Sequence, residues 1–191
     1  MNIDHNTLFY TFSTMAQVLA AILAVTAVFV FAKSSEFRVK MQREMGNVVK
    51  VLDSFPQFEE WRIQATKAER HGVIPEMKSI FGDRFKGPDL GPEIKEACKY
   101  GLFNSNLNDH IFMRFAKQAY CGLLLIGLLL VAISFTSETN VIAFPTISCV
   151  CLELLTAFTL YLLVSIARLI HFTTQEKIPE KYPQFLPEEH V

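Results

Sequence analysis

The stretch VIAFPTISCVCLELLTAFTLYLLVSIARLI, residues 141–170, decides the fold of this chain. It is long enough to cross a bilayer, because a spanning helix needs about 20 consecutive residues that are mostly apolar. Its one carboxylate, Glu153, has apolar or small neighbours on every side. A charge at that depth costs at least ~2.5 kcal/mol on insertion scales, so such residues rarely face lipid. The stretch therefore predicts an integral membrane protein with one energetically costly acidic residue.

Two other apolar runs predict two further membrane spans, so the fold class we expect is an all-α integral membrane protein with three transmembrane helices. The polar segment between the first two spans has helical periodicity and predicts a small helical cytoplasmic domain. The predicted organisation is an external N-terminus at 1–7, spans at 8–32, 115–135 and 141–170, the helical domain at 33–114, an external loop at 136–140 and an extended or disordered cytoplasmic tail at 171–191.

The basic residues predict the orientation of the spans. All 18 Lys and Arg residues follow the first apolar run, and Lys33, Arg38, Arg114, Lys117 and Arg168 flank the ends of spans. Lys and Arg beside a span mark its cytoplasmic side. We therefore expect the N-terminus outside, the C-terminus in the cytoplasm, and a location in a bacterial plasma (inner) membrane.

Composition and motifs argue against several classes of function. The net charge of −1 gives no basic signature for direct nucleic-acid binding. The four cysteines have no zinc-ligand spacing, and we expect them to be reduced and packed, with no metal or cofactor. The sequence has no Ser/His/Asp, Cys/His, Walker or dinucleotide-binding signature. We expect that the protein is not an enzyme, although scattered residues can converge in a fold.

The helical segment has an amphipathic start that we expect to continue directly out of the first span. Its apolar residues recur every three or four positions and are followed by Pro56: Phe37, Met41, Met45, Val48, Leu52 and Phe55. Further helices are predicted at 58–70, 75–81 and from Pro92 to about residue 102. The Gly- and Pro-rich residues 82–91 predict a loop, and residues 104–109 predict a second break before the helix of the second span.

Polar and small residues within the spans are the strongest candidates for function. On the first span, Ser13 and Gln17 share one face, at heptad-like spacing, with a stripe of small residues: Ala20, Ala24 and Ala27. This stripe predicts close packing with another helix, either within the chain or between subunits. On the third span, Glu153 and Thr156 share one face. Glu153 bonds to Gln17 or Thr156 and holds helices together, forms a ring around an oligomer axis that attracts cations, or takes part in a proton relay. Ser13, Thr14 and Gln17 either line a water-filled path or belong to ordinary helix packing.

A basic and aromatic cluster in the helical segment is a weaker candidate. Trp61, Arg62, Lys67 and Arg70 could bind a phosphate-containing ligand or a partner protein. Interleaved glutamates, such as Glu60 and Glu69, favour an ordinary solvated helix surface instead.

These features together favour a homo-oligomeric membrane channel or pore that conducts cations and is gated through its cytoplasmic helices. The alternative is a membrane anchor or scaffold that recruits a cytosolic protein partner, and an enzyme acting on lipid is a third hypothesis. The general plan, a few spans with a small helical cytoplasmic domain, resembles many small bacterial membrane proteins, some of which are membrane subunits of phage-defence systems. That resemblance concerns architecture alone.

Overall fold

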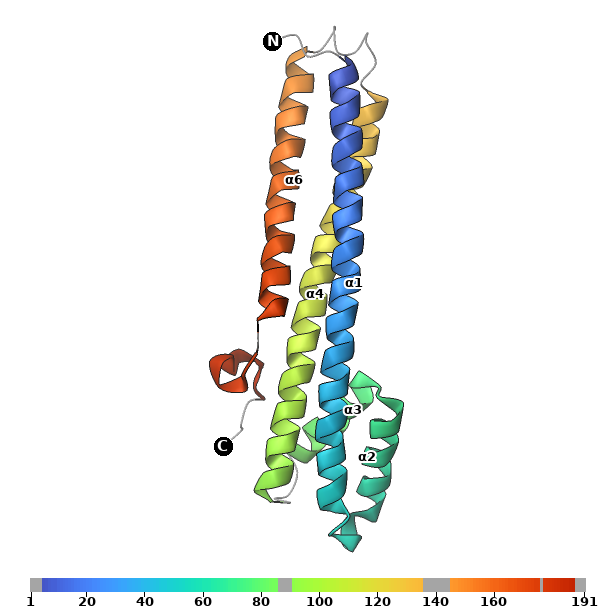
Figure 1. Cartoon of the computed structure of the whole chain (residues 1–191), viewed down its shortest axis with the longest axis vertical. Coiled ribbons are helices and arrows are strands. Elements are labelled where there is room, and N and C mark those ends of the chain that lie inside the picture. The colour runs from blue at the N-terminus through green and yellow to red at the C-terminus, as the bar shows by residue number, and fades with distance from the viewer. Residues whose placement is uncertain (1–4, 86–90, 136–144, 176, 188–191) are drawn as a thin grey trace. The chain divides into compact units, whose positions relative to one another are not determined.

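The computed structural model describes residues 5–85, 91–135, 145–175 and 177–187, and every regular element among them is helical (Figure 1). The long helices are α1 (His5–Leu52), α4 (Pro92–Ser134) and α6 (Pro145–Thr174). Each contains a segment long and apolar enough to cross a bilayer. This confirms the predicted all-α fold with three candidate spans. The predicted external loop at 136–140 lies outside the described residues.

The chain divides into two compact units, which we call the spanning unit and the helical unit. The spanning unit comprises Met1–Val30 and Met113–Thr174, and the helical unit comprises Phe31–Phe112 and Gln175–Val191. Both α1 and α4 contribute one part of their length to each unit. The protein is thus a multi-span helical membrane protein in which two of the spanning helices continue into a second folded unit.

The spanning unit packs α1, α4 and α6 around a narrow apolar core. The buried residues of α1 recur every three or four positions along the helix: Leu8, Phe12, Ala16, Leu19 and Leu23. They pack in one cluster with Leu125 and Leu129 of α4 and with Leu162 and Ile166 of α6. Gly122 has no side chain where α4 meets Leu23, and an added Cβ there would collide with that leucine. Small residues allow this close approach of membrane helices.

The helical unit packs short helices against the second part of α1 and the first part of α4. Its short elements are η1 (Pro56–Phe58), α2 (Glu59–His71) and α3 (Ile74–Phe85). Gly72 ends α2 with φ of 60°, a left-handed conformation that glycine adopts without steric cost. The core lies between these helices. Met41, Met45, Val48 and Leu52 form the α1 side of the core and confirm the predicted amphipathic face of α1. The other helices contribute Ala65, Ala68, Met77, Phe81, Ile94, Ala97, Cys98 and Leu102.

Two predicted interruptions of the helices are wrong in the described structure. Residues 104–109 do not break the chain, because α4 runs through them with Phe103, Leu107 and Ile111 buried one helical turn apart. Burial of this apolar face outweighs the weak helix propensity of the intervening asparagines. Residues 82–85, predicted as loop, are the last turn of α3, whereas 86–90 lie outside the described residues.

The predicted extended tail also differs from the structure. Beyond α6, two 3-10 turns form at η2 (Pro179–Lys181) and η3 (Pro183–Phe185). Phe185 is buried against α4, with its ring centroid 6.3 Å from that of Phe103. A tail segment that buries an aromatic side chain is held in place, unlike the unattached ends of most domains.

Candidate functional site

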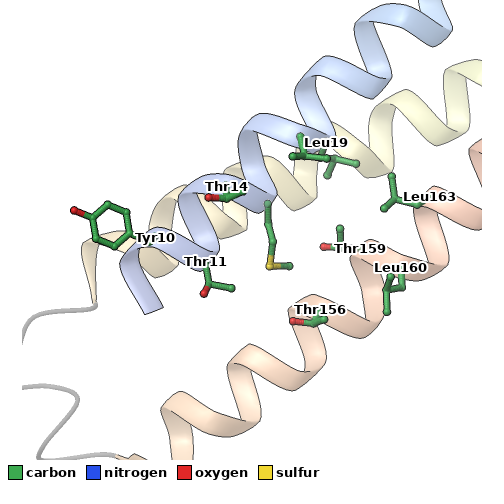
Figure 2. A pocket seen from close by; sticks show the side chains of 10 residues that line it. Tyr10, Thr11, Thr14, Leu19, Thr156, Thr159, Leu160 and Leu163 are labelled. Carbon is green, nitrogen blue, oxygen red and sulfur yellow. The ribbon is translucent and has the colours of Figure 1, made fainter. Parts of the chain in front are cut away.

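A groove between α1 and α6 in the spanning unit is lined by hydroxyl-bearing residues. Its volume is about 500 Å³. Figure 2 shows Thr11 and Thr14 of α1 opposite Thr156 and Thr159 of α6, with Tyr10 at one end. The remaining lining is apolar: Met15, Val18, Leu19, Leu160 and Leu163. The groove thus places a polar strip along an otherwise apolar pair of helices.

The threonine hydroxyls are positioned to present oxygen atoms to the groove. Thr11 donates its hydroxyl proton to the carbonyl oxygen of Thr7 at 2.7 Å, and Thr159 donates to that of Leu155 at 2.8 Å. A hydroxyl that has donated its only proton keeps its lone pairs as acceptors. The oxygen of Thr11, which is partly exposed, can therefore accept a hydrogen bond from water or contact a cation, whereas Thr159 is buried at the floor of the groove.

Glu153 lies on the same helix stripe as the groove lining, one turn before Thr156. Residues three apart on a helix are neighbours on its surface. The side chain of Glu153 is exposed, and among the described residues it has no hydrogen bond or ion pair. The expected bonds from Glu153 to Gln17 or Thr156 are therefore not present within the described part of one chain. This leaves a carboxylate uncovered on a helix that is long and apolar enough to span a bilayer.

The small-residue stripe of α1 is uncovered as well. Gln17, Ala20 and Ala24 are exposed and Ala27 and Ser13 are partly buried, whereas the core of the unit is built on a different face of α1. Thr14 and Thr156 of the predicted intramembrane residues line the groove, whereas Ser13 and Gln17 do not. The predicted close packing of the alanines then requires another chain, and it stays a prediction.

The remaining span, on α4, presents a different kind of surface. Between residues 121 and 133 its exposed residues are leucine, valine and glycine: Leu123, Leu124, Gly127, Leu128, Leu130 and Val131. Gln118, near the start of this span, points inward and donates to both the carbonyl and the hydroxyl oxygen of Ser165 on α6, each at 2.9 Å. The sequence analysis missed this link, although a lone glutamine flanking an apolar run was a signal for it.

The structure separates Trp61 from the basic members of the cluster, because Arg62, Lys67 and Arg70 line one surface groove of α2. Trp61 turns toward the core of the helical unit, where its ring packs against Phe58 and the Arg84 guanidinium. Arg62 forms an ion pair with Asp53 at 3.0 Å. Lys67 and Arg70 are exposed on α2, and neither has an ion pair within the described residues. Lys67 and Arg70 therefore form a small basic face on α2 that does not include the tryptophan.

Arg84 is a buried cation in the helical unit. Burial lowers its pKa to about 10, and its Nη1 atom has no hydrogen-bond partner among the described residues. Burial also raises the pKa of the nearby Cys98 thiol to about 12. At neutral pH Cys98 is therefore a protonated, unreactive thiol, because nucleophilic attack requires the thiolate.

Neither the metal-ligating side chains nor comparisons with known proteins assign a function to the chain. Within residues 5–85, 91–135, 145–175 and 177–187, no three His, Cys, Asp or Glu side chains are arranged to hold a metal ion. The chain matches no protein-family model, no curated protein and no solved structure.

Proposed function

We propose that the protein is an oligomeric membrane channel that conducts cations along the surface formed by α1 and α6. One observation carries this proposal. The uncovered polar side chains of the spans gather on α1 and α6, whereas the uncovered surface of α4 between residues 121 and 133 is apolar. Lipid suits the α4 surface and does not suit an uncovered carboxylate.

Association of several copies supplies the environment that the α1 and α6 surface lacks. Three helices from one chain leave Glu153 and Thr14 exposed, and Thr11 and Thr156 partly exposed. If copies surround an axis, these groups face a shared water-filled path and α4 faces lipid. Carboxylates and hydroxyl oxygens along such a path favour cations over anions. The orientation predicted from basic residues would place Glu153 nearer the external end of the path.

Ion flux into liposomes that contain the purified protein tests this function. Wild type is expected to pass monovalent cations in preference to anions, and Glu153→Gln to lose most of that preference while the protein stays folded. Glu60→Gln, which removes a carboxylate from the exposed surface of α2, is the matched control and should keep the preference. Equal selectivity in wild type and Glu153→Gln would contradict a role for Glu153 in conduction.

A membrane anchor that recruits an acidic cytosolic protein is a second candidate function. The basic face of α2 supports it, because exposed Lys67 and Arg70 lack ion pairs among the described residues. Such charges steer association with oppositely charged partners. A partner that co-purifies with wild type and is lost in Lys67→Glu/Arg70→Glu, from a protein without ion flux, would favour the anchor over the channel.

A further inference from the structure

The C-terminal segment docks on α4 through one aromatic side chain, in a site made only of residues from the helical unit. Phe185 is 7% exposed and contacts the rings of Phe103 and His110, with centroid distances of 6.3 and 5.1 Å. Asn106 donates a hydrogen bond from Nδ2 to the carbonyl oxygen of Phe185 at 3.1 Å. The segment is thus bound by both a side-chain pocket and a backbone contact.

The approach to this docking site is preorganised. Pro179 and Pro183 each begin a 3-10 turn, and proline restricts the conformations open to a free segment. Between the turns, Tyr182 accepts a hydrogen bond from Lys177 at 2.9 Å, with the Lys177 ammonium 4.4 Å from the tyrosine ring centroid. These contacts reduce the entropy lost when Phe185 docks.

The C-terminal segment connects α6 to the docking site on α4. The segment follows directly from α6, the helix that carries Glu153 and Thr156, and Phe185 lies eleven residues after Thr174, where α6 ends. Its receptor residues, Phe103 to His110, precede the span of the same helix α4. The docked segment therefore links the end of one span to the residues before another span through noncovalent contacts.

We propose that residues 177–187 form a releasable strap that holds the channel in its low-conductance state. The proposal rests on the channel function, because it assigns the strap to the control of α6. While Phe185 is docked, the end of α6 is tethered to α4 and the surface bearing Glu153 is restrained. Release of Phe185 removes the tether and lets α6 change its packing. One side chain and one hydrogen bond suit a switch whose released state is populated at about 0.1–10%.

Two measurements on Phe185→Ala test the strap. Limited proteolysis of the purified full-length protein reports the docking, and we expect cleavage after Lys177 or Lys181 to become about 10- to 100-fold faster, since a fully buried phenylalanine is lost. Cation flux into liposomes should rise several-fold. Phe185→Leu, which keeps an apolar side chain, should lie between Phe185→Ala and wild type in both measurements. Ile63→Ala, on the exposed surface of α2 and outside the strap, is the matched control and should behave as wild type.

The outcomes separate the strap from the channel itself. Faster cleavage in Phe185→Ala with flux equal to that of a conducting wild type would overturn the strap and leave the channel intact. Unchanged cleavage would overturn the docking. If neither wild type nor Phe185→Ala passes ions, although circular dichroism shows both folded, the channel fails and the regulatory role of the strap fails with it.

Discussion

The two parts of α1 share a burial rhythm but differ in the residues that they turn outward. In the spanning unit α1 buries Leu19 and Leu23 and exposes Val18, Val25 and Val28; in the helical unit it buries Met41 and Met45 and exposes Arg38, Lys40 and Arg43. Each part therefore packs against helical neighbours in the same way. The outward residues match the surroundings of each part, which are a membrane span for the first part and water for the second.

The contrast also explains the shape of the two cores. The helical unit must bury its apolar residues inside itself, and its core draws on α1, α2, α3 and α4. The spanning unit leaves most of its apolar surface to lipid and keeps a narrow core between three helices. Within that unit an uncovered polar group is the exception that requires explanation, and Glu153 is such a group.

The largest change in the free energy of unfolding is expected for a cavity in the core of the helical unit. Phe81→Ala removes a fully buried ring from the helical unit and should lower its free energy of unfolding by about 3–5 kcal/mol. Trp61 is the sole tryptophan and packs against this core, so its fluorescence during denaturant unfolding reports the change. Leu128→Ala, on the exposed apolar surface of α4, should change the same transition by less than about 0.5 kcal/mol. Equal losses in both variants would remove the distinction between the units.

A lysine placed on each outward surface sharpens the comparison. Leu128 is 56% exposed and Val39 is 59% exposed, so the two side chains are almost equally accessible. They are expected to differ in what surrounds them, which is lipid at Leu128 and water at Val39. Leu128→Lys should disfavour membrane insertion by about 2.5–3.5 kcal/mol, whereas Val39→Lys should be neutral. An insertion assay with glycosylation sites on either side of the span measures the difference. Normal insertion of Leu128→Lys would mean that this surface of α4 does not meet lipid.

A smaller effect is expected for the polar link within the spanning unit. Gln118→Leu removes both hydrogen bonds to Ser165 and should destabilise that unit by about 1–2 kcal/mol. Unfolding in sodium dodecyl sulfate, followed by circular dichroism, measures the loss. Combined with Ser165→Ala in a double-mutant cycle, the pair should show coupling, because one of the two bonds ends on the serine hydroxyl. Additive effects would show that this bond contributes little.

The smallest expected effect is a gain in stability, opposite in sign to the losses above. Arg84→Met replaces a buried cation lacking a full set of partners and should raise the free energy of unfolding by about 1 kcal/mol. The folded pKa of Arg84, about 10, lies below its ordinary value of 12.5. The folded state therefore binds this proton less tightly than the unfolded chain, and the cost is fully present below pH 10 and shrinks above it. The advantage of Arg84→Met should be constant from pH 6 to 9, and a destabilised variant would assign Arg84 an essential contact.

Periodicity within one helix was sufficient to predict much of the fold. The recurrence of Phe37, Met41, Met45, Val48 and Leu52 identified the buried face of α1, and Pro56 and Pro92 correctly marked element boundaries. The continuity of α4 through residues 104–109 could not be predicted in this way. It depends on the burial of Leu107 and Ile111, which outweighs the local preference of Asn and Asp for turns.

The candidate site was harder to predict because it joins residues far apart in the chain. Glu153 and Thr156 were identified as costly or polar members of an apolar run, a property of single residues. Their placement beside Thr11 and Thr14 depends on the rotation of α1 and α6 about their axes, which no local pattern specifies. The docking of Phe185 on Phe103 is a similar case, since 82 residues of sequence separate the two rings.

Accessibility to a charged thiol reagent tests the central claim, that the α1 and α6 surface faces water and the α4 surface faces lipid. Thr156→Cys and Leu128→Cys would be compared in a background in which Cys121, Cys149 and Cys151 are replaced. Cys98 can remain, because its buried thiol has a pKa raised to about 12. A membrane-impermeant methanethiosulfonate reagent is expected to label Thr156→Cys in liposomes and to leave Leu128→Cys unmodified. Labelling of Leu128→Cys, or protection of Thr156→Cys in a conducting protein, would contradict the account.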